Sequence, residues 1–207
     1  MNQCEYFHAN MEYIITATRD NYTIETYSTN STKILNMIKE KLTEKGFTGI
    51  TTYTSRPMRK GEQQDVTYHF ISEEDFKQKI NEGFFAEWKS YITVNGVWYY
   101  GTALEDLENS DDKSVIILTP DGYRDVVNKL SKKPISIYIY ANNPTIKKRL
   151  LKRGDDNNEA QRRLEHDNED FKGIENEVDR IVYNNDGTNI NEVVQKILDF
   201  CKEMEGC

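Results

Sequence analysis

The sequence predicts an α/β fold, in which helices flank a parallel sheet and a smaller antiparallel lobe is inserted into the sheet domain. Short apolar runs typical of buried strands alternate with segments of helical hydrophobic spacing, which is the pattern of a parallel sheet. A stretch at about 55–103 interrupts this alternation and is rich in Tyr, Phe and Trp. The chain of 207 residues is long enough for one domain with such an insertion.

The elements of the first half are predicted from apolar spacing and from residues that cap or stop helices. A hairpin turn is predicted where Asn is followed by Gly, because both residues adopt positive φ. In order, the predicted elements are a helix over 34–42 stopped by Gly46, a strand over 47–53, a helix over 73–82 capped by Ser72 and ended by Gly83, and a hairpin turn at Asn95-Gly96.

The second half contains three short apolar runs of the kind found in strands that are buried on both faces. Asn143-Pro144 opens one helix, because proline suits a first helical position, and Asn189 followed by Glu192 opens the last. The predicted strands are 115–118, 135–140 and 180–183, and the predicted helices are 143–153 and one beginning after 189.

Composition and charge narrow the range of partners. The net charge is −8, so the chain has no general electrostatic attraction to nucleic acid or to an anionic membrane, and a phosphate ligand must be held by local arginines. No apolar run is long enough to span a bilayer, and residues 1–20 show no secretory signal. The three cysteines have no metal-binding spacing and predict a reducing, cytoplasmic setting.

Two arginines three residues apart form the first candidate site. Arg56 and Arg59 lie in the turn RPMRKGE, with Tyr68 shortly after, and two planar guanidinium groups can converge on one phosphate. On spacing alone, a solvated basic turn is the more common structure for such a segment.

Two further motifs lie in the aromatic stretch. Glu87 stands among aromatic residues in FFAEW, which is unusual because an unpaired buried charge is costly; the alternative is an exposed Glu at the start of a strand. In YYGT, the hydroxyls of Tyr100 and Thr102 flank a glycine that would permit close approach of a ligand. Ordinary strand packing of the tyrosines is the alternative.

Three arginines in the second half form the last candidate site. Arg149 and Arg153 are four residues apart and share a helix face, and Arg163 follows across the polar run 155–158. Such a group suits a lid that closes over phosphates, whereas a solvated helix face is the alternative.

Taken in order, the segments TSRPMRKGEQQDVTYHFIS, FFAEW, YYGT, KKRLLKRG and QRRL resemble the guanylate kinase family over about residues 47–200. The resemblance implies a P-loop-kinase-like parallel sheet, an inserted antiparallel lobe that binds GMP, and an arginine-bearing lid. It implies one domain over 1–207, with a core of 11–54 and 103–207, a nucleotide-monophosphate lobe at 55–102 and a lid at 154–170.

The resemblance also implies roles for individual residues. Glu87 falls where a carboxylate reads the guanine edge, Thr102 where a hydroxyl contacts the base, and Asp121 on an acidic residue of the site. The implied GMP-binding residues are Thr52, Arg56, Arg59, Tyr68, Glu87, Tyr100 and Thr102. The implied catalytic residues are Arg149, Arg153, Arg163 and Asp121.

The chain departs from the family on the side of the phosphoryl donor. The family has a Gly-rich phosphate loop ending in Gly-Lys-Ser/Thr, whereas no glycine precedes Gly46 here. The corresponding segment, 25–32, reads ETYSTNST, and the strand-like runs before it can pair as a hairpin instead. Thr119 stands where the family often has an acid, and the stretch between Trp88 and Tyr99 is longer than usual. Donor-side candidates are Ser31 at the lysine position, Thr32 with its hydroxyl, Lys33 one or two positions late, and Asn184.

Two functions therefore remain open. The first is transfer of a phosphoryl group from a nucleoside triphosphate to GMP, with Mg²⁺ needed only if the chain is active with ATP. The second is a non-catalytic module that binds a guanine nucleotide or a protein. The sequence predicts GMP as a ligand, makes ATP doubtful, indicates no nucleic acid, membrane or resident metal, and identifies no protein partner.

Overall fold

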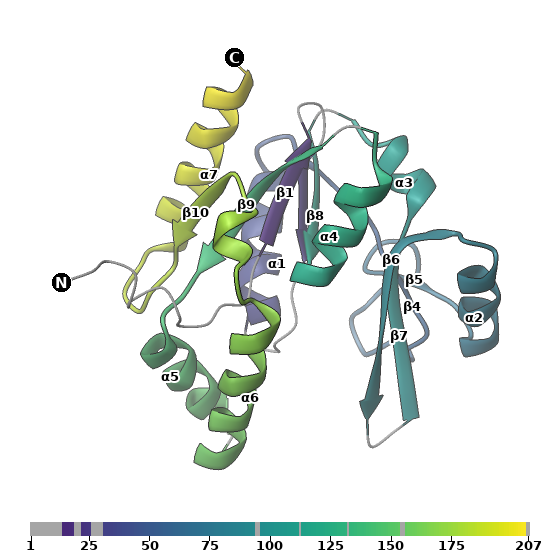
Figure 1. Cartoon of the computed structure of the whole chain (residues 1–207), viewed down its shortest axis with the longest axis horizontal. Helices are drawn as coiled ribbons and strands as arrows, with labels where there is room; N and C mark the ends of the chain where they lie inside the picture. Colours follow the sequence, from purple (N-terminus) through teal and green to yellow (C-terminus); the bar gives the residue numbers. More distant parts are fainter. Residues whose placement is uncertain are drawn as a thin grey trace.

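A computed structural model describes residues 14–18, 22–25, 31–93, 96–111, 113–131, 133–153 and 156–205. Its centre is a sheet with the order β10-β9-β1-β2, and the two-stranded sheet β3-β8 continues it because β8 lies beside β2 (Figure 1). These strands are β1 (Ile14–Thr18), β2 (Tyr22–Glu25), β3 (Thr48–Gly49), β8 (Ser114–Leu118), β9 (Pro134–Tyr140) and β10 (Arg180–Tyr183).

The sheet is parallel except at β1. The pairs β10–β9 and β3–β8 are parallel, whereas β1 runs antiparallel to both β2 and β9. The predicted parallel sheet therefore contains one antiparallel strand, and the alternative of a hairpin before residue 26 is confirmed. The reason is chain length: only three residues separate β1 from β2, and a parallel crossover needs a dozen or more.

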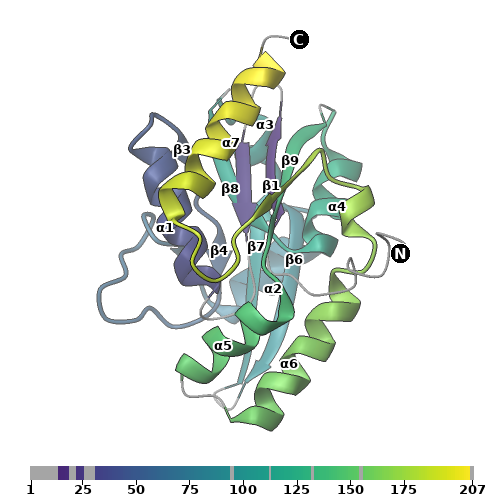
Figure 2. The same cartoon turned by 90° about the vertical axis from the view of Figure 1, so that its left-hand side faces the viewer.

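Helices cover both faces of the sheet, as Figure 2 shows. On one face, α1 (Ser31–Thr43) packs beside α7 (Ile190–Glu205), and on the other lies α4 (Pro120–Lys129). Side chains of β8 alternate between the two cores: Val115 and Ile117 join the first, and Ile116 and Leu118 the second. Burial on both faces explains why this strand reads as a continuous apolar run. The predicted α/β fold is confirmed.

A second sheet, with the order β5-β4-β7-β6, stands apart from the first (Figure 1). Its strands β6 and β7 form a hairpin with Thr93 paired to Gly96, whereas Asn95 of the predicted turn lies outside the described part. The pair β4–β5 is parallel, so the lobe is mixed rather than purely antiparallel. Its elements are β4 (Tyr53–Thr54), β5 (His69–Phe70), α2 (Glu73–Asn81), β6 (Phe85–Thr93) and β7 (Gly96–Ala103).

The strand expected over 47–53 is interrupted. Ile50 N still donates to Val115 O in the first sheet, but Thr52 O accepts from His69 N in the second. The chain changes sheets at Thr51, so no single ladder of hydrogen bonds can include the whole segment. The division of the chain at 54/55 and 102/103 stays a prediction.

The remaining helices lie near the ends of the strands. Helix α3 (Leu104–Glu108) follows β7, and α5 (Asn143–Arg153) packs against α6 (Asn157–Asp170) around Ile146, Leu150 and Leu164. The short 3-10 helix η2 (Ile174–Asn176) leads into β10. Among the described residues, no helix is long and apolar enough to cross a membrane.

Candidate functional site

One face of the β6–β7 hairpin carries polar side chains. The register pairs Glu87 with Thr102 and Lys89 with Tyr100. Directly opposed residues of antiparallel strands share a face, and residues two apart on one strand share it too, about 7 Å along. These four side chains therefore occupy the same face of the hairpin.

Glu87 is buried on this face, with only 6% of its surface exposed. Its Oε1 accepts a hydrogen bond of 2.6 Å from the Thr102 hydroxyl. Burial raises the pKa of Glu87 to about 7, against the opposing effects of that hydrogen bond and of Lys89 and Lys129. The alternative of an exposed Glu at the start of a strand is wrong, and Trp88 is the exposed residue instead.

The first turn of α4 approaches the same carboxylate. A Cβ atom on Gly122 would lie 3.2 Å from Glu87 Oε2, so a side chain there would crowd the carboxylate. Thr119 caps this helix, because its hydroxyl accepts a hydrogen bond from Gly122 N. At the other end of α4, Lys129 Nζ donates to the carbonyl oxygens of Phe85 and Ala86 and fixes the start of β6.

Gly101 serves packing on the opposite face of the hairpin. A Cβ atom there would come within 3.0 Å of the rings of Phe76 and Phe85. The suggestion that this glycine opens space for a ligand is therefore wrong, and the two hydroxyl residues beside it point to the other face.

Arg56 is also buried, with 4% of its surface exposed, and binds Glu62 in a two-pronged ion pair. Its Nη1 and Nη2 donate to the two Glu62 oxygens at 2.9 and 2.7 Å, and Nη1 also donates to Pro57 O. Burial alone would lower the pKa of Arg56, but the contacts with Glu62 and Tyr100 raise it. The hydrogen bonds from Arg56 hold the pKa of Glu62 below its usual range.

The turn around Arg56 brings the neighbouring predicted residues together. Arg59 N donates to Glu62 at 2.7 Å, while the exposed Arg59 guanidinium lies 6.0 Å from the Trp98 ring. The Tyr68 ring lies 5.5 Å from the Arg56 guanidinium and 6.1 Å from the Tyr100 ring.

A cavity of about 670 Å³ opens behind this turn, between α1, β3 and the segment 66–68. Thr52, which is buried, and Tyr68 form part of its wall. Neither Glu87 nor Thr102 lines it.

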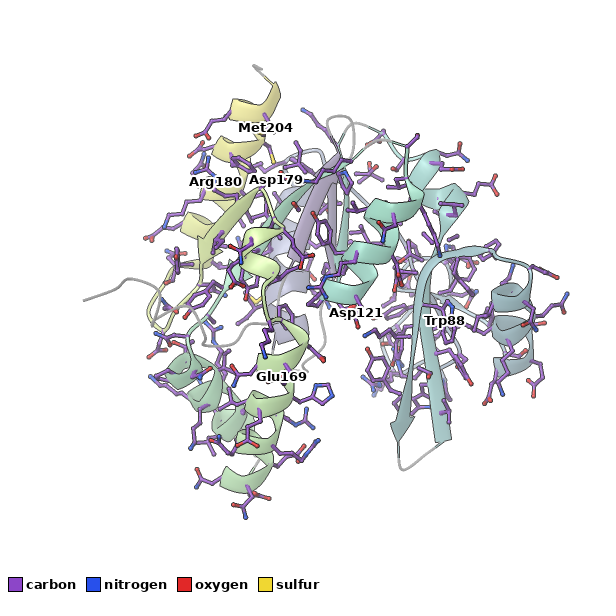
Figure 3. The ribbon with its side chains drawn as sticks, viewed as in Figure 1. Trp88, Asp121, Glu169, Asp179, Arg180 and Met204 are labelled. Atoms are coloured by element: carbon purple, nitrogen blue, oxygen red, sulfur yellow. The ribbon has the colours of Figure 1, made fainter. Side chains whose placement is uncertain are left out.

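Asp121 lies in the first turn of α4, at the end of the helix that faces β6 (Figure 3). Its Oδ2 is 2.5 Å from Lys89 Nζ, and its Oδ1 is 3.2 Å from Arg124 Nη1. The hydrogen bond from Lys89 is the main reason that the pKa of Asp121 is lowered. Arg124 in turn pairs with Glu177, so the ion pairs run from β6 across α4 to the end of η2.

Two of the predicted residues meet at the end of β10. Arg149 Nη2 donates to Asn184 O at 2.8 Å, and Asn184 N donates to Tyr140 O. Asn184 is buried, so the Arg149 side chain reaches from α5 toward the end of the central sheet.

Arg163 lies on α6, so most of the predicted lid is a regular helix. Its Nε donates to Glu159 Oε1, one turn earlier, at 2.7 Å. Glu159 also binds Arg162, and the hydrogen bonds from both arginines lower the pKa of Glu159 to about 2. In this conformation Arg163 is therefore paired along its own helix, and the Asp156 side chain caps the start of α6.

Several donor-side predictions fall outside the described part of the structure. Residues 26–30 and 154–155 are not described, nor are the side chains of Ser31, Thr32, Lys33 and Arg153. The backbones of Ser31–Lys33 form the first turn of α1, directly after the undescribed segment.

Comparison with known proteins identifies the family. A family model described as guanylate kinase matches residues 27–202. The chain belongs to the guanylate kinase family. It is 31% identical over 150 residues to a guanylate kinase of Campylobacter jejuni strain RM1221, covering 70% of this chain and 71% of the relative. It is 32% identical over 164 residues to one from Helicobacter pylori, covering 77% and 76%.

The guanylate kinase fold is also found by structural comparison. A crystal structure of guanylate kinase from Anaplasma phagocytophilum superimposes with a TM-score of 0.62, at 20% sequence identity, covering 82% of this chain and 81% of that one. The predicted family and the predicted fold are both confirmed.

Sequence reasoning missed three residues of the site in this guanylate kinase family member. Glu62 was visible in RPMRKGE as the one acid beside two arginines. Lys89 was visible as the residue two positions after Glu87, which shares its face in a strand. The approach of Gly122 to Glu87 had no local signal, because it depends on how α4 packs against β6.

Proposed function

We propose that this guanylate kinase family member binds GMP along the polar face of β6–β7. The observation that carries the proposal is the placement of two buried, oppositely charged groups around that face. Glu87 lies opposite Thr102, and Tyr100, two pairs further along, contacts the Arg56 guanidinium. A nucleoside monophosphate is neutral at its base and anionic at its phosphate, so it matches a carboxylate at one end and a guanidinium at the other.

The carboxylate end favours guanine. Ionised Glu87 has acceptors only, and guanine offers two donors, N1–H and N2–H, on one edge. Thr102 donates to Oε1, which leaves the lone pairs on Oε2 and the second lone pair on Oε1 for a base. Adenine would present a lone pair to the carboxylate, and sites built on such pairings discriminate strongly.

The guanidinium end suits a phosphate. Glu62 and Pro57 take three of the five N–H groups of Arg56, which leaves two for Tyr100 and a ligand. Arg59, whose side chain is exposed, adds a second guanidinium group from the same turn. Thr52, Tyr68 and Tyr100 supply the remaining hydroxyl groups proposed to bind GMP.

We further propose phosphoryl transfer from a nucleoside triphosphate to GMP as the activity, with Arg149, Arg153, Arg163 and Asp121 as the residues that serve it. Retention of the arginines supports this, since a pure binding module has no need of them. Known relatives that carry the name guanylate kinase support it as well. The second candidate, a non-catalytic module that binds a guanine nucleotide or a protein, is favoured by one observation: the chain has no glycine before Gly46.

The described residues do not fit a resident Mg²⁺. Asp121 is held by Lys89 and Arg124, and the Thr119 hydroxyl caps α4. Within the described ranges, no group of three or more His, Cys, Asp or Glu side chains is arranged to hold a metal. Mg²⁺ would reach such a site with the phosphates of the triphosphate.

Calorimetric titration of the full chain with GMP and with ATP, each alone, tests the binding proposal. GMP should bind and AMP should not. An assay of ADP release then tests transfer, and the two candidates predict different results: turnover with GMP for the enzyme and none for the module. Equal affinity for GMP and AMP would contradict the proposed site.

A further inference from the structure

Lys89 links the hairpin to the first turn of α4. It follows Glu87 by two residues on β6, so both side chains are on the face that the hairpin turns toward α4. Its Nζ lies 2.5 Å from Asp121 Oδ2, across 32 positions of sequence. Figure 3 shows Asp121 at the end of α4 nearest this hairpin.

The ion pair lies beside the buried carboxylate. A Cβ atom on Gly122, the residue after Asp121, would lie 3.2 Å from Glu87 Oε2. Lys129 ties the far end of α4 to Phe85 and Ala86 through their carbonyl oxygens. Lys89 and Lys129 therefore attach the two ends of α4 to the same strand, with Glu87 between them.

The charges that face Glu87 come from two elements. Helix α4 contributes Asp125 and Lys129, and β6 contributes Lys89, whose ion-pair partner Asp121 stands next to Gly122 on α4. Strand β7 contributes the uncharged Thr102 hydroxyl. Lys129 is already committed to two backbone carbonyls, so Lys89 is the cation whose position depends on a carboxylate partner near the pocket.

We propose that Lys89 is a positioning residue for guanine recognition: its ion pair with Asp121 holds the first turn of α4 against the pocket, and its ammonium favours the ionised form of Glu87 that guanine requires. The inference rests on the proposed GMP site. A residue that only tied the lobe to α4 would leave the charge of Glu87 unaffected.

Titration of Glu87 in the ligand-free full chain, followed by NMR of ¹³C-labelled glutamate, tests the electrostatic part. In the unmodified protein the midpoint should lie near 7. Lys89→Met removes a positive charge and should raise the midpoint by about half a unit or more, whereas Asp121→Asn removes a negative charge and should lower it. Both variants break the Lys89–Asp121 ion pair, and Asp121→Asn also breaks the pair with Arg124, so a purely mechanical tie predicts effects of the same sign and the proposal predicts opposite ones.

Two controls sharpen the result. Lys89→Arg keeps the charge and should leave the midpoint unchanged. Lys77→Met removes a lysine that forms a similar 2.5 Å ion pair on α2, in the same lobe, and should also leave it unchanged. Shifts of the same sign in Lys89→Met and Asp121→Asn, or no shift in either, would overturn the proposal. If Lys89→Met does not fold, a raised or unchanged midpoint in Asp121→Asn overturns it.

The pH dependence of GMP affinity tests whether Lys89 influences guanine recognition. GMP should bind the ionised form, so affinity should fall as the pH drops through the Glu87 midpoint. That fall should occur at higher pH in Lys89→Met and at lower pH in Asp121→Asn. Absence of GMP binding in the unmodified chain would contradict the proposed function while leaving the ligand-free titration as an independent test of Lys89.

Discussion

Glu62 and Arg56 form a two-pronged ion pair in which both carboxylate oxygens bind the guanidinium, at 2.7 and 2.9 Å. The same carboxylate accepts the backbone N–H of Arg59. One side chain therefore fixes the orientation of the first arginine and the backbone position of the second. A planar guanidinium held on one edge presents its other edge in a defined direction, which reduces the ordering required when a phosphate binds.

Replacing Glu62 with Gln should weaken both folding and GMP binding. The variant leaves the buried Arg56 charge without its carboxylate, which should cost about 1–3 kcal/mol of the free energy of unfolding near neutral pH. Because the pKa of Glu62 is lowered in the folded state, its contribution is present above the usual carboxylate range and is lost as the pH falls through the lowered pKa. Urea unfolding at neutral and acidic pH should therefore show a difference between the two proteins that shrinks in acid.

The control for this substitution is Glu74→Gln on α2, an exposed carboxylate of the same lobe. It should change neither property. If Glu62→Gln bound GMP as tightly as the unmodified chain, the orientation of Arg56 would not matter for the phosphate.

Replacing Glu87 with Gln should reduce GMP affinity. The change substitutes an amide donor for one acceptor that faces the donors of guanine, and losing that charge-assisted bond should cost about 2–3 kcal/mol, or roughly 30- to 150-fold in the dissociation constant. In thermal melting, GMP should stabilise the unmodified protein by mass action, and AMP should not. A variant that kept full affinity would show that Glu87 does not contact the base.

The same substitution should stabilise the ligand-free fold at alkaline pH. Burial raises the pKa of Glu87 to about 7, above its ordinary value, so the folded state holds a proton that the unfolded chain loses. The contribution of Glu87 to the free energy of unfolding is fully present below the pKa of the unfolded chain and is lost as the pH rises through about 7. Glu87→Gln carries no charge, so near pH 8 it should be more stable to unfolding than the unmodified protein by about 1–3 kcal/mol. The advantage should disappear near pH 4, where the unmodified carboxyl is protonated in both states. Equal stability of the two proteins near pH 8 would mean that the carboxylate pays no penalty for burial.

Much of this fold was predictable because local signals and tertiary packing agree. Ser72 accepts a hydrogen bond from Asp75 N at the start of α2, and Gly83 follows the helix with φ of 70°, as the sequence indicated. The interruption of the strand predicted over 47–53 could not be predicted from the sequence. Its residues change sheets at Thr51, and that change depends on β7 and β8, which lie far along the chain.

The candidate site was predictable in its residue types but not in its contacts. Glu87 and Arg56 stand out because charges in aromatic or turn segments are unusual. The ion pairs of the site differ in sequence separation. Glu62 is six residues from Arg56, whereas Asp121 is 32 residues from Lys89. Pairing of Arg163 with Glu159 follows from helical spacing alone, once α6 is known to be regular from Asn157.

The sequence predicts a departure from the family on the donor side. Phosphoryl transfer relies on positioning and on neutralising charge, and a phosphate loop supplies both through its backbone N–H groups and its lysine. The segment between β2 and α1 contains no glycine, and its threonines resist the positive φ angles that a phosphate-binding nest needs. Helix α1 begins at Ser31, next to Thr32, and the backbone N–H groups of a helix's first turn have no partner within the helix and can bind an anion.

We therefore expect ATP to bind at least tenfold more weakly than GMP in calorimetry, because one helix terminus replaces several donors and a lysine. Transfer from ATP to GMP should be far below the roughly 1–100 s⁻¹ typical of kinases. Lys33→Ala tests whether a lysine has moved by one or two positions instead of being lost, with Lys41→Ala, in the last turn of the same helix, as the matched control. A turnover rate above about 10 s⁻¹ would show that the chain catalyses transfer as an ordinary kinase does. Loss of that rate in Lys33→Ala but not in Lys41→Ala would show that Lys33 holds the donor phosphates.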